Sequence, residues 1–256
     1  MSKLKIGLVQ YSPVWEEPQL TIQKIDKLLD SYNLEDIDLL VFPEMSLTGF
    51  TSESQKFAEE LDGVSFRYFM ELSRSTKTEI FAGLIEHYDK EIFNSLIHFD
   101  SKGLIRVRYR KVHSFSLAGE NKNFSSGDAP VTTRIGKITF GLSICYDLRF
   151  PELYRYYGKN KADVLINIAN WPVDRIEHWD KLLQARAIEN LSYMIGVNRV
   201  GNDPALTYTG HSSVIDPMGN VISCPDKEEV LIIEIDLDKV KETRTKLPFL
   251  NDIKLI

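Results

Sequence analysis

The stretch Gly141–Glu152 reads GLSICYDLRFPE, and the interpretation of the rest of the chain depends on it. The apolar run Ile138–Ile144 predicts a strand that ends at Cys145. Pro151 then favours the start of a helix shortly after the thiol. A thiol between a strand and a helix start lies beside free backbone N–H groups, which suits a nucleophile. A single cysteine at the end of an apolar strand is more often a small buried side chain, so other features must decide.

The composition is that of a globular protein with a large core, since 43% of the 256 residues are hydrophobic and 27% are charged. The formal net charge is −6 without a cluster of Lys or Arg, so no nucleic-acid partner is expected. Two cysteines, Cys145 and Cys224, are too few for a disulfide framework and indicate a reducing, cytoplasmic environment. The first apolar stretch, in MSKLKIGLVQYSP, has no small-residue cleavage pattern and predicts a strand. No apolar run approaches the roughly 20 residues of a membrane helix, so no membrane partner is expected.

Strand-like and helix-like segments are mixed along the whole chain, without a repeat or a flexible linker. Strands are expected at 4–10, 38–42, 79–86, 92–99, 104–109, 131–135, 137–144, 164–168, 194–200, 212–216, 221–224 and 230–236. Helices are expected from Pro18, over 55–77, over 150–158, after Asp174 and from Asp238. Glu177, three residues after Asp174, completes a pattern typical of a capping box. The mixture predicts one layered α/β domain over residues 1–256.

Two segments of the chain do not fit regular elements. Residues 111–128 are polar and irregular, and loops of this length inside a compact domain tend to be functional. The tail, about residues 247–256, is too apolar for a free terminus. We expect it to pack on the body of the protein or on a second subunit.

Glu44, Lys111 and Cys145 each follow a predicted strand, where open α/β sheets place their sites. Each has an ordinary alternative, because Glu44 can cap the next segment and Lys111 can be a solvated flank. Together they supply a proton acceptor, a cation that stabilises negative charge, and a thiol. The five histidines form no signature with the cysteine, and HExxH, GxSxG and phosphate-binding Gly-rich motifs are absent. A metal site is therefore not expected.

Three segments resemble the catalytic blocks of the nitrilase superfamily, the carbon–nitrogen hydrolases. They are FPEMSLTGF at 42–50, RKVHSF at 110–115 and GLSICYDLRFPE at 141–152, and the similarity extends over nearly the whole chain. The resemblance implies a four-layer α-β-β-α sandwich, a homodimer, and no metal or organic cofactor. It also implies that Cys145 is the nucleophile, Glu44 the general base and Lys111 the residue that stabilises the tetrahedral intermediate. Glu120, in LAGENKNF, matches a second glutamate often found near the lysine.

The segments NWPVDRIEHWDKLLQARAIENLSYM (170–194), VNRVG (197–201) and KLPFL (246–250) are most similar to omega-amidases. Omega-amidases release ammonia from the distal amide of 2-oxoglutaramate or 2-oxosuccinamate. The free carboxylate of such a substrate needs a cationic pocket. Arg175 and Arg199 are candidates for that pocket by position, with Tyr146 and Trp171 as candidate pocket walls.

Several alternatives remain open. Arg149, Arg186 and Arg199 are also interpretable as structural ion-pair partners. The amide can instead belong to deaminated glutathione, to an N-carbamoyl compound or to a simple aliphatic amide. A non-catalytic interaction protein that retains the fold is the alternative from a different class. Glu44, Lys111 and Cys145 are all present, which argues against an interaction protein because binding alone does not need them. Cys224 ends a predicted strand and is interpreted as structural.

Overall fold

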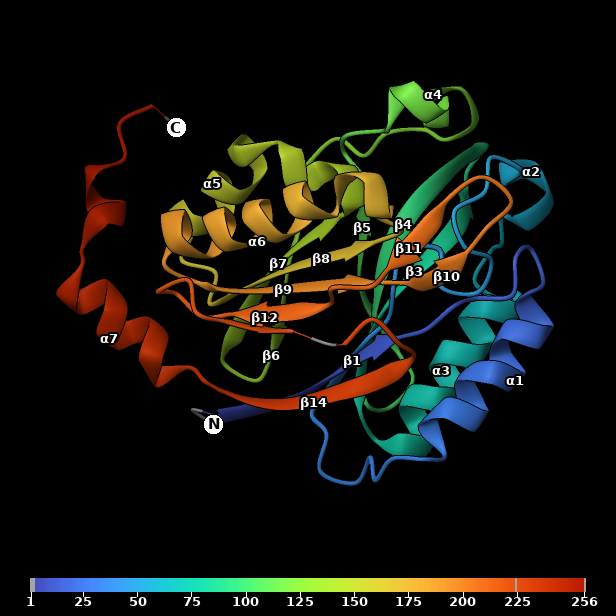
Figure 1. Ribbon diagram of the computed structural model, residues 1–256, viewed down its shortest axis with the longest axis horizontal. Helices are drawn as coiled ribbons and strands as arrows, with labels where there is room; N and C mark the ends of the chain where they lie inside the picture. The colour runs from blue at the N-terminus through green and yellow to red at the C-terminus, as the bar shows by residue number, and fades with distance from the viewer. Residues whose placement is uncertain (1–2, 224, 256) are drawn as a thin grey trace.

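Two mixed six-stranded sheets lie face to face in the computed structural model, which describes residues 3–223 and 225–255 (Figure 1). The first sheet has the order β14-β1-β2-β3-β4-β5. Its strands are β1 (Lys3–Gln10), β2 (Leu39–Val41), β3 (Glu79–Tyr88), β4 (Glu91–Phe99), β5 (Ile105–Arg110) and β14 (Glu229–Asp236). The second sheet has the order β13-β12-β9-β8-β7-β6. Its strands are β6 (Thr132–Ile135), β7 (Ile138–Ile144), β8 (Val164–Ala169), β9 (Tyr193–Asn198), β12 (Ser213–Ile215) and β13 (Val221–Ser223).

Helices cover the outer face of each sheet, so the expected four-layer α-β-β-α sandwich is confirmed. The first sheet is covered by α1 (Pro18–Leu29) and α3 (Val64–Thr76), and the second by α5 (Pro151–Lys159) and α6 (Ile176–Asn190). Short elements complete the chain: α2 (Ser54–Phe57), α4 (Glu120–Asn123), α7 (Asp238–Lys246) and the hairpin of β10 (Val200–Asn202) with β11 (Thr207–Thr209). Single 3-10 turns are η1 (Ser116–Ala118), η2 (Cys145–Arg149), η3 (Val173–Arg175) and η4 (Phe249–Asp252).

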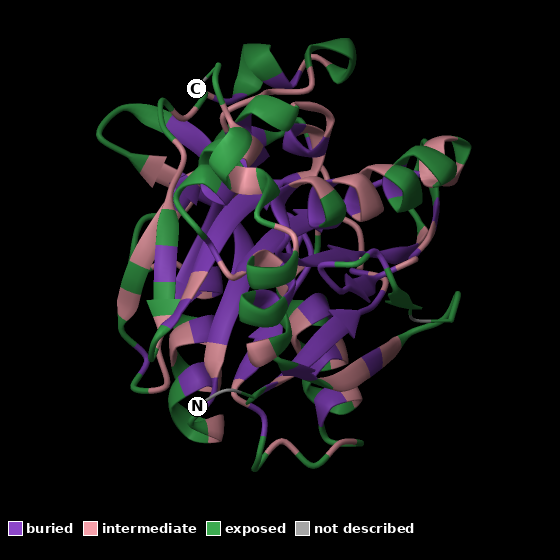
Figure 2. Cartoon of the chain, turned by 90° about the vertical axis from the view of Figure 1, so that its left-hand side faces the viewer, coloured by how far each residue is buried: buried purple, intermediate pink, exposed green. Residues whose placement is uncertain are grey.

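The core lies between the sheets and under the helices, and Figure 2 shows its strands as buried ribbons. All residues of β2 and β8 are buried, as expected for apolar strands that are covered on both faces. Phe81 of β3 meets Phe140 of β7 edge to face, with ring centroids 5.4 Å apart. The buried His98 of β4 adds a polar link, because its Nδ1 lies 2.7 Å from Thr133 Oγ1 of β6. These contacts fix one sheet against the other.

The predicted helix over 55–77 is wrong between Ala58 and Gly63, where the chain separates α2 from α3. Glu59 is extended there and pairs with the end of β3: its N–H donates to Ile85 O at 3.0 Å and its carbonyl accepts from His87 N at 2.8 Å. Its carboxylate also accepts from Ser65 N at 2.7 Å, close to the start of α3. A sheet contact distant in sequence therefore interrupts the helical pattern.

Two smaller expectations also differ from the structure, and a third is not tested by it. Asp174 does not cap a helix, because it lies inside η3 and α6 begins at Ile176 without a side-chain cap. The strand expected over 194–200 ends at Asn198, and β10 and β11 follow as a separate hairpin. Cys224 lies outside the described residues.

The tail after α7 projects from the body of the protein (Figure 1). Phe249 is 58% exposed and Leu255 is 98% exposed. Packing of the tail on the body of the protein and packing on a second subunit both stay predictions. Within the described part of the chain, none of the helices combines the length and the apolar character needed to span a bilayer.

Candidate active site

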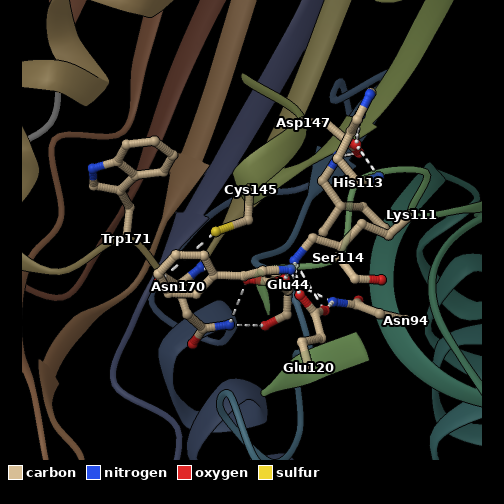
Figure 3. Close-up of polar contacts among 12 residues, drawn as sticks. Glu44, Asn94, Lys111, His113, Ser114, Glu120, Cys145, Asp147, Asn170 and Trp171 are labelled. Carbon is tan, nitrogen blue, oxygen red and sulfur yellow. Dashed lines mark hydrogen bonds and ion pairs between the residues drawn. The ribbon is translucent and has the colours of Figure 1, made fainter. Parts of the chain in front are cut away.

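Glu44, Lys111 and Cys145 lie where the carboxyl ends of strands from both sheets meet (Figure 3). In the first sheet β2 is parallel to β3, and two antiparallel pairings make β5 run in the same direction. The ends of β2 and β5 therefore place Glu44 and Lys111 at one edge. In the second sheet β7 and β8 are parallel, and their ends place Cys145 and Asn170 at the facing edge. Each sheet contributes part of the site.

Lys111 binds two carboxylates and is buried, with 2% of its surface exposed. Its Nζ lies 2.9 Å from Glu44 Oε1, and 3.0 and 2.9 Å from the two carboxylate oxygens of Glu120. Burial alone lowers the pKa of Lys111, but the charges of Glu120 and Glu44 outweigh it and raise the pKa well above the usual range. The lysine is therefore a permanent ammonium in the site. Glu120 is itself fixed by the N–H of Phe115, which donates to it at 2.6 Å.

Two asparagines that the sequence analysis missed complete this network. Asn94 of β4 donates its amide N–H groups to Glu44 Oε1 at 2.7 Å and to Glu120 Oε1 at 2.9 Å. Asn170 donates its backbone N–H to Glu44 Oε2 at 2.9 Å and its side-chain amide to the Glu44 carbonyl at 2.7 Å. Both side chains are buried. For Asn94 the available signal was an amide side chain inside the predicted strand over 92–99. For Asn170 it was the segment NIANWP (167–172), which follows a predicted strand.

Cys145 begins the turn η2 with a φ of +45°, a left-handed conformation that is rare for residues other than glycine. Its Sγ lies 4.0 Å from the carbonyl oxygen of Asn170. Desolvation and the charge of Glu44 raise the pKa of the Cys145 thiol well above its usual range, although Lys111 acts in the opposite direction. The sulfur is therefore a neutral thiol near pH 7. It needs a base to become a nucleophile.

Asp147 connects the ends of β5 and β7. It is completely buried, and its Oδ2 accepts from Ile144 N at 2.9 Å and from the Tyr109 hydroxyl at 2.7 Å. Its Oδ1 accepts from His113 N at 2.9 Å and lies 2.8 Å from His113 Nδ1. The His113 ring stacks on Phe150 with centroids 3.8 Å apart. One carboxylate thus fixes the two strand ends that bear the ammonium and the thiol.

A pocket with about 480 Å³ of empty volume, including its open mouth, leads to the thiol. Its walls are largely aromatic and contain two arginines. They include Phe50, Phe115, Tyr146, Arg149, Trp171, Pro172, Arg175, Leu206 and Tyr208. The predicted pocket residues Tyr146, Trp171 and Arg175 therefore lie in its lining. Arg149, which the sequence analysis treated as a structural residue, lies there too, with its guanidinium 4.7 Å from the Trp171 ring centroid.

Arg199, the second predicted carboxylate-binding residue, does not line this pocket. Its side chain is completely buried behind Tyr208, with the guanidinium 4.4 Å from the centroid of that ring. The Nε donates to Val200 O at 3.2 Å and an Nη donates to Asn202 O at 3.0 Å. The hairpin that follows β9 turns this arginine away from the open space.

The sequence profile of the family described as Carbon-nitrogen hydrolase matches residues 5–245. The chain belongs to the carbon–nitrogen hydrolase family. This carbon–nitrogen hydrolase is 35% identical to a 2-oxoglutaramate amidase of Paenarthrobacter nicotinovorans, over 98% of this chain and 89% of the relative. It is 31% identical to a 2-oxoglutaramate amidase of Bacillus subtilis, over 98% of each chain. A CN-hydrolase superfamily protein of Xanthomonas campestris, solved with an arsenic adduct in its active site, is similar in structure. That similarity has a TM-score of 0.94 at 30% identity and covers 100% of this chain and 99% of that one.

The carbon–nitrogen hydrolase thus presents a thiol and an ammonium in the lining of one pocket, with the buried carboxylate of Glu44 bound to the ammonium. These are the groups that hydrolysis of a linear amide needs: a nucleophile, a proton carrier and a cation for the oxyanion. Within the ranges 3–223 and 225–255, no three His, Cys, Asp or Glu side chains form a group that could hold a metal ion.

Proposed function

We propose that this carbon–nitrogen hydrolase hydrolyses the distal amide of a small dicarboxylic monoamide, such as 2-oxoglutaramate or 2-oxosuccinamate. The observation that carries the proposal is the pair Arg149 and Arg175 in the pocket that leads to Cys145. A guanidinium can bind the free carboxylate with two N–H groups while the amide at the other end of the substrate reaches the thiol. The two relatives named 2-oxoglutaramate amidases support the same substrate class.

The surroundings of the two arginines favour an anionic ligand. Arg149 lies over Trp171, and Arg175 lies 5.6 Å from the ring centroid of Phe115. Among the ion pairs of the described residues, none joins either arginine to a carboxylate. Among the described residues, the hydrogen-bond contact of Arg149 Nη1 is with His178 Nδ1 at 3.4 Å. Their charges are therefore available to a substrate, and aromatic stacking restricts their motion without using their N–H groups.

The proposed reaction passes through a thioester. Glu44 accepts the thiol proton, and the sulfur of Cys145 forms a bond to the amide carbon. Lys111 and the backbone N–H of Tyr146 stabilise the oxyanion. The C–N bond breaks as Glu44 returns the proton to the leaving nitrogen, and ammonia departs. Glu44 then deprotonates a water molecule, which attacks the thioester. The carboxylic acid leaves and the thiol is regenerated.

In this scheme Glu120 is a positioning residue for Lys111. Its two oxygens take two of the ammonium's donors, which leaves the third donor for Glu44 in the resting site. Asn94 bridges the same two carboxylates and keeps them on the ammonium. We further propose that a second copy of the chain covers the exposed tail to form a homodimer, and that the enzyme acts in the cytoplasm.

Ammonia release from 2-oxoglutaramate by the purified protein tests this function, with Cys145→Ala as the inactive control. Arg149→Met and Arg175→Met are each expected to lower kcat/KM for the monoamide by at least about tenfold, because a charge-assisted hydrogen bond inside the pocket is lost. Hydrolysis of a neutral aliphatic amide should change less in both variants. Turnover of deaminated glutathione, an N-carbamoyl compound or an aliphatic amide in place of the monoamide would refute the substrate class. No ammonia from any of them would favour a non-catalytic interaction protein.

A further inference from the structure

Arg199 is a buried cation that forms no direct ion pair with a carboxylate, although the charge of the nearby Asp203 acts on it, and this needs an explanation. Its guanidinium is completely buried, and burial lowers its pKa from the usual range. One of its terminal nitrogens, Nη1, has no hydrogen-bond partner in the part of the chain that the structure describes. No ion pair of the described chain includes this residue. Burying a charge without a direct ion pair opposes folding, and an apolar side chain of similar size would avoid that cost. The arginine is therefore not explained by stability.

The contact that Arg199 does make is with the pocket residue Tyr208. The guanidinium lies over one face of the ring, and the Tyr208 hydroxyl donates to Asp203 Oδ2 at 2.6 Å. Asp203 Oδ1 also accepts from Ala205 N at 2.8 Å and from Leu206 N at 2.7 Å, which shapes the tip of the hairpin. The ring is thus fixed at its face and at its hydroxyl. The same aspartate positions Leu206, a second pocket residue.

Arg199 also underlies another part of the pocket lining. A Cβ built on Gly49 would lie 2.8 Å from Arg199 Nη1, and Gly49 has a φ of +71°. The next residue, Phe50, lines the pocket. The guanidinium therefore fills the space that a side chain at position 49 would need. It contacts both Tyr208 and the segment that carries Phe50.

The hairpin closes the side of the pocket where Arg175 lies. Strand β11, which bears Tyr208, packs against η3, the turn that ends with Arg175. Cys145 and the hairpin residues line the same pocket. The space between the thiol and this hairpin is the space that the acyl chain of a substrate must fill.

We infer that the β10–β11 hairpin sets the length of the acyl chain, with Tyr208 as the specificity-determining residue and Arg199 as the positioning residue behind it. The inference rests on the proposed amidase activity and names its substrate class as short acyl amides of restricted length. It does not require the substrate to carry a carboxylate. One methylene in a fitted apolar pocket changes kcat/KM by roughly 10- to 200-fold. The wild type should therefore prefer one chain length over the next longer one by at least about tenfold.

Two series of primary amides test the inference separately from the proposed function. One series carries a terminal carboxylate: succinamate, glutaramate and adipamate. The other is neutral: propionamide, butyramide, valeramide and hexanamide. The readout is the ratio of kcat/KM for adjacent lengths in each series. Calorimetry on Cys145→Ala protein gives the ratio of Kd values for the same pairs of amides, so that binding is measured even where turnover is slow.

Arg199→Met and Tyr208→Leu are each expected to bring the length ratio within about threefold of one, because the fixed ring is lost. Arg199→Lys should behave like Arg199→Met, since lysine keeps the charge but not the planar stack. Arg244→Met is the matched control. Arg244 also donates to backbone carbonyls, among them Leu191 O at 3.0 Å, but it lies on α7 and does not line the pocket. Arg244→Met should lower stability and leave the ratio of kcat/KM between adjacent chain lengths unchanged.

Each result decides the inference. A wild-type length ratio in Arg199→Met or Tyr208→Leu overturns it, as does a wild type with no length preference in either series or no binding of any amide. A ratio restored by Arg199→Lys shows that the charge acts and overturns the role of the stack. A preference for neutral amides with a length ratio that collapses in the variants refutes the proposed carboxylate substrate and supports the hairpin.

Discussion

Asp147→Asn tests whether one buried carboxylate fixes both halves of the active site. Asn has the shape of Asp but offers a single acceptor oxygen where the carboxylate offers two. Asp147 accepts on both oxygens, from Ile144 and Tyr109 on one side and from His113 on the other. The substitution therefore changes hydrogen bonding at the ends of β5 and β7 with little change in volume.

The structure gives the size of the effect. If the asparagine oxygen faces Ile144 and Tyr109, it keeps the hydrogen bonds from both, and the NH₂ group then faces His113. The Nδ1 of His113 can accept from that group as the other tautomer, but the backbone N–H of His113 loses its acceptor. One buried unsatisfied N–H costs about 1–3 kcal/mol. For a chain of this size the Tm should fall by roughly 2–12 °C. A shift of about 1 Å at the thiol should lower kcat about 100-fold.

The assay combines thermal unfolding with kcat and KM. Tyr109→Phe removes one donor and leaves the carboxylate three, so its effects should be smaller than those of Asp147→Asn. Asp174→Asn changes an exposed aspartate and should match the wild type. Wild-type Tm and kcat in Asp147→Asn would refute the linking role. A lower Tm with wild-type kcat would show that the carboxylate stabilises the fold without positioning the catalytic groups.

Two further predictions concern the thiol and the base. The raised pKa of Cys145 predicts that its alkylation by iodoacetamide keeps accelerating above pH ~8.5, the ordinary thiol pKa. Because Glu44 raises this pKa and Lys111 lowers it, Glu44→Gln should speed alkylation at pH 8 and Lys111→Met should slow it; shifts of the opposite sign would contradict the assignment. Gly83→Ala places a Cβ 2.6 Å from Glu44 Cα, so it should cost about 1–3 kcal/mol of stability and lower kcat at least about tenfold. An unchanged kcat would show that the backbone of the base can move without loss.

The sequence allowed prediction of most strands because their signals are local. Strands such as β2 and β8 are short, largely apolar and covered on both faces, so the predicted ends lie within one residue of the strand ends. The helix break near Glu59 was not predictable, since its cause is pairing with β3. Strand β11 was missed because TYT is too short to show a period. Local patterns thus predicted elements, and contacts between distant segments decided the exceptions.

The candidate site shows the same division. Glu44, Lys111 and Cys145 follow predicted strands, so their residue types and positions could be related to chemistry. Asn94 was missed because its partners lie on other segments, Glu44 after β2 and Glu120 on α4. The directions of the arginine side chains were harder still to predict. Arg199 turns behind the hairpin while Arg149 turns into the pocket, and spacing along the chain does not encode that difference.

The pairing of β1 with β14 has a consequence for biosynthesis. The two strands pair along their full length, from Lys3 with Asp236 to Gln10 with Glu229, although they lie near opposite ends of the chain. On a ribosome that adds about 5–20 residues per second, β1 waits roughly 10 to 45 seconds for its partner. During that time its open edge can pair with another nascent chain. Ribosome-bound chains that stop before β14 should therefore be the form of this protein that most needs a chaperone.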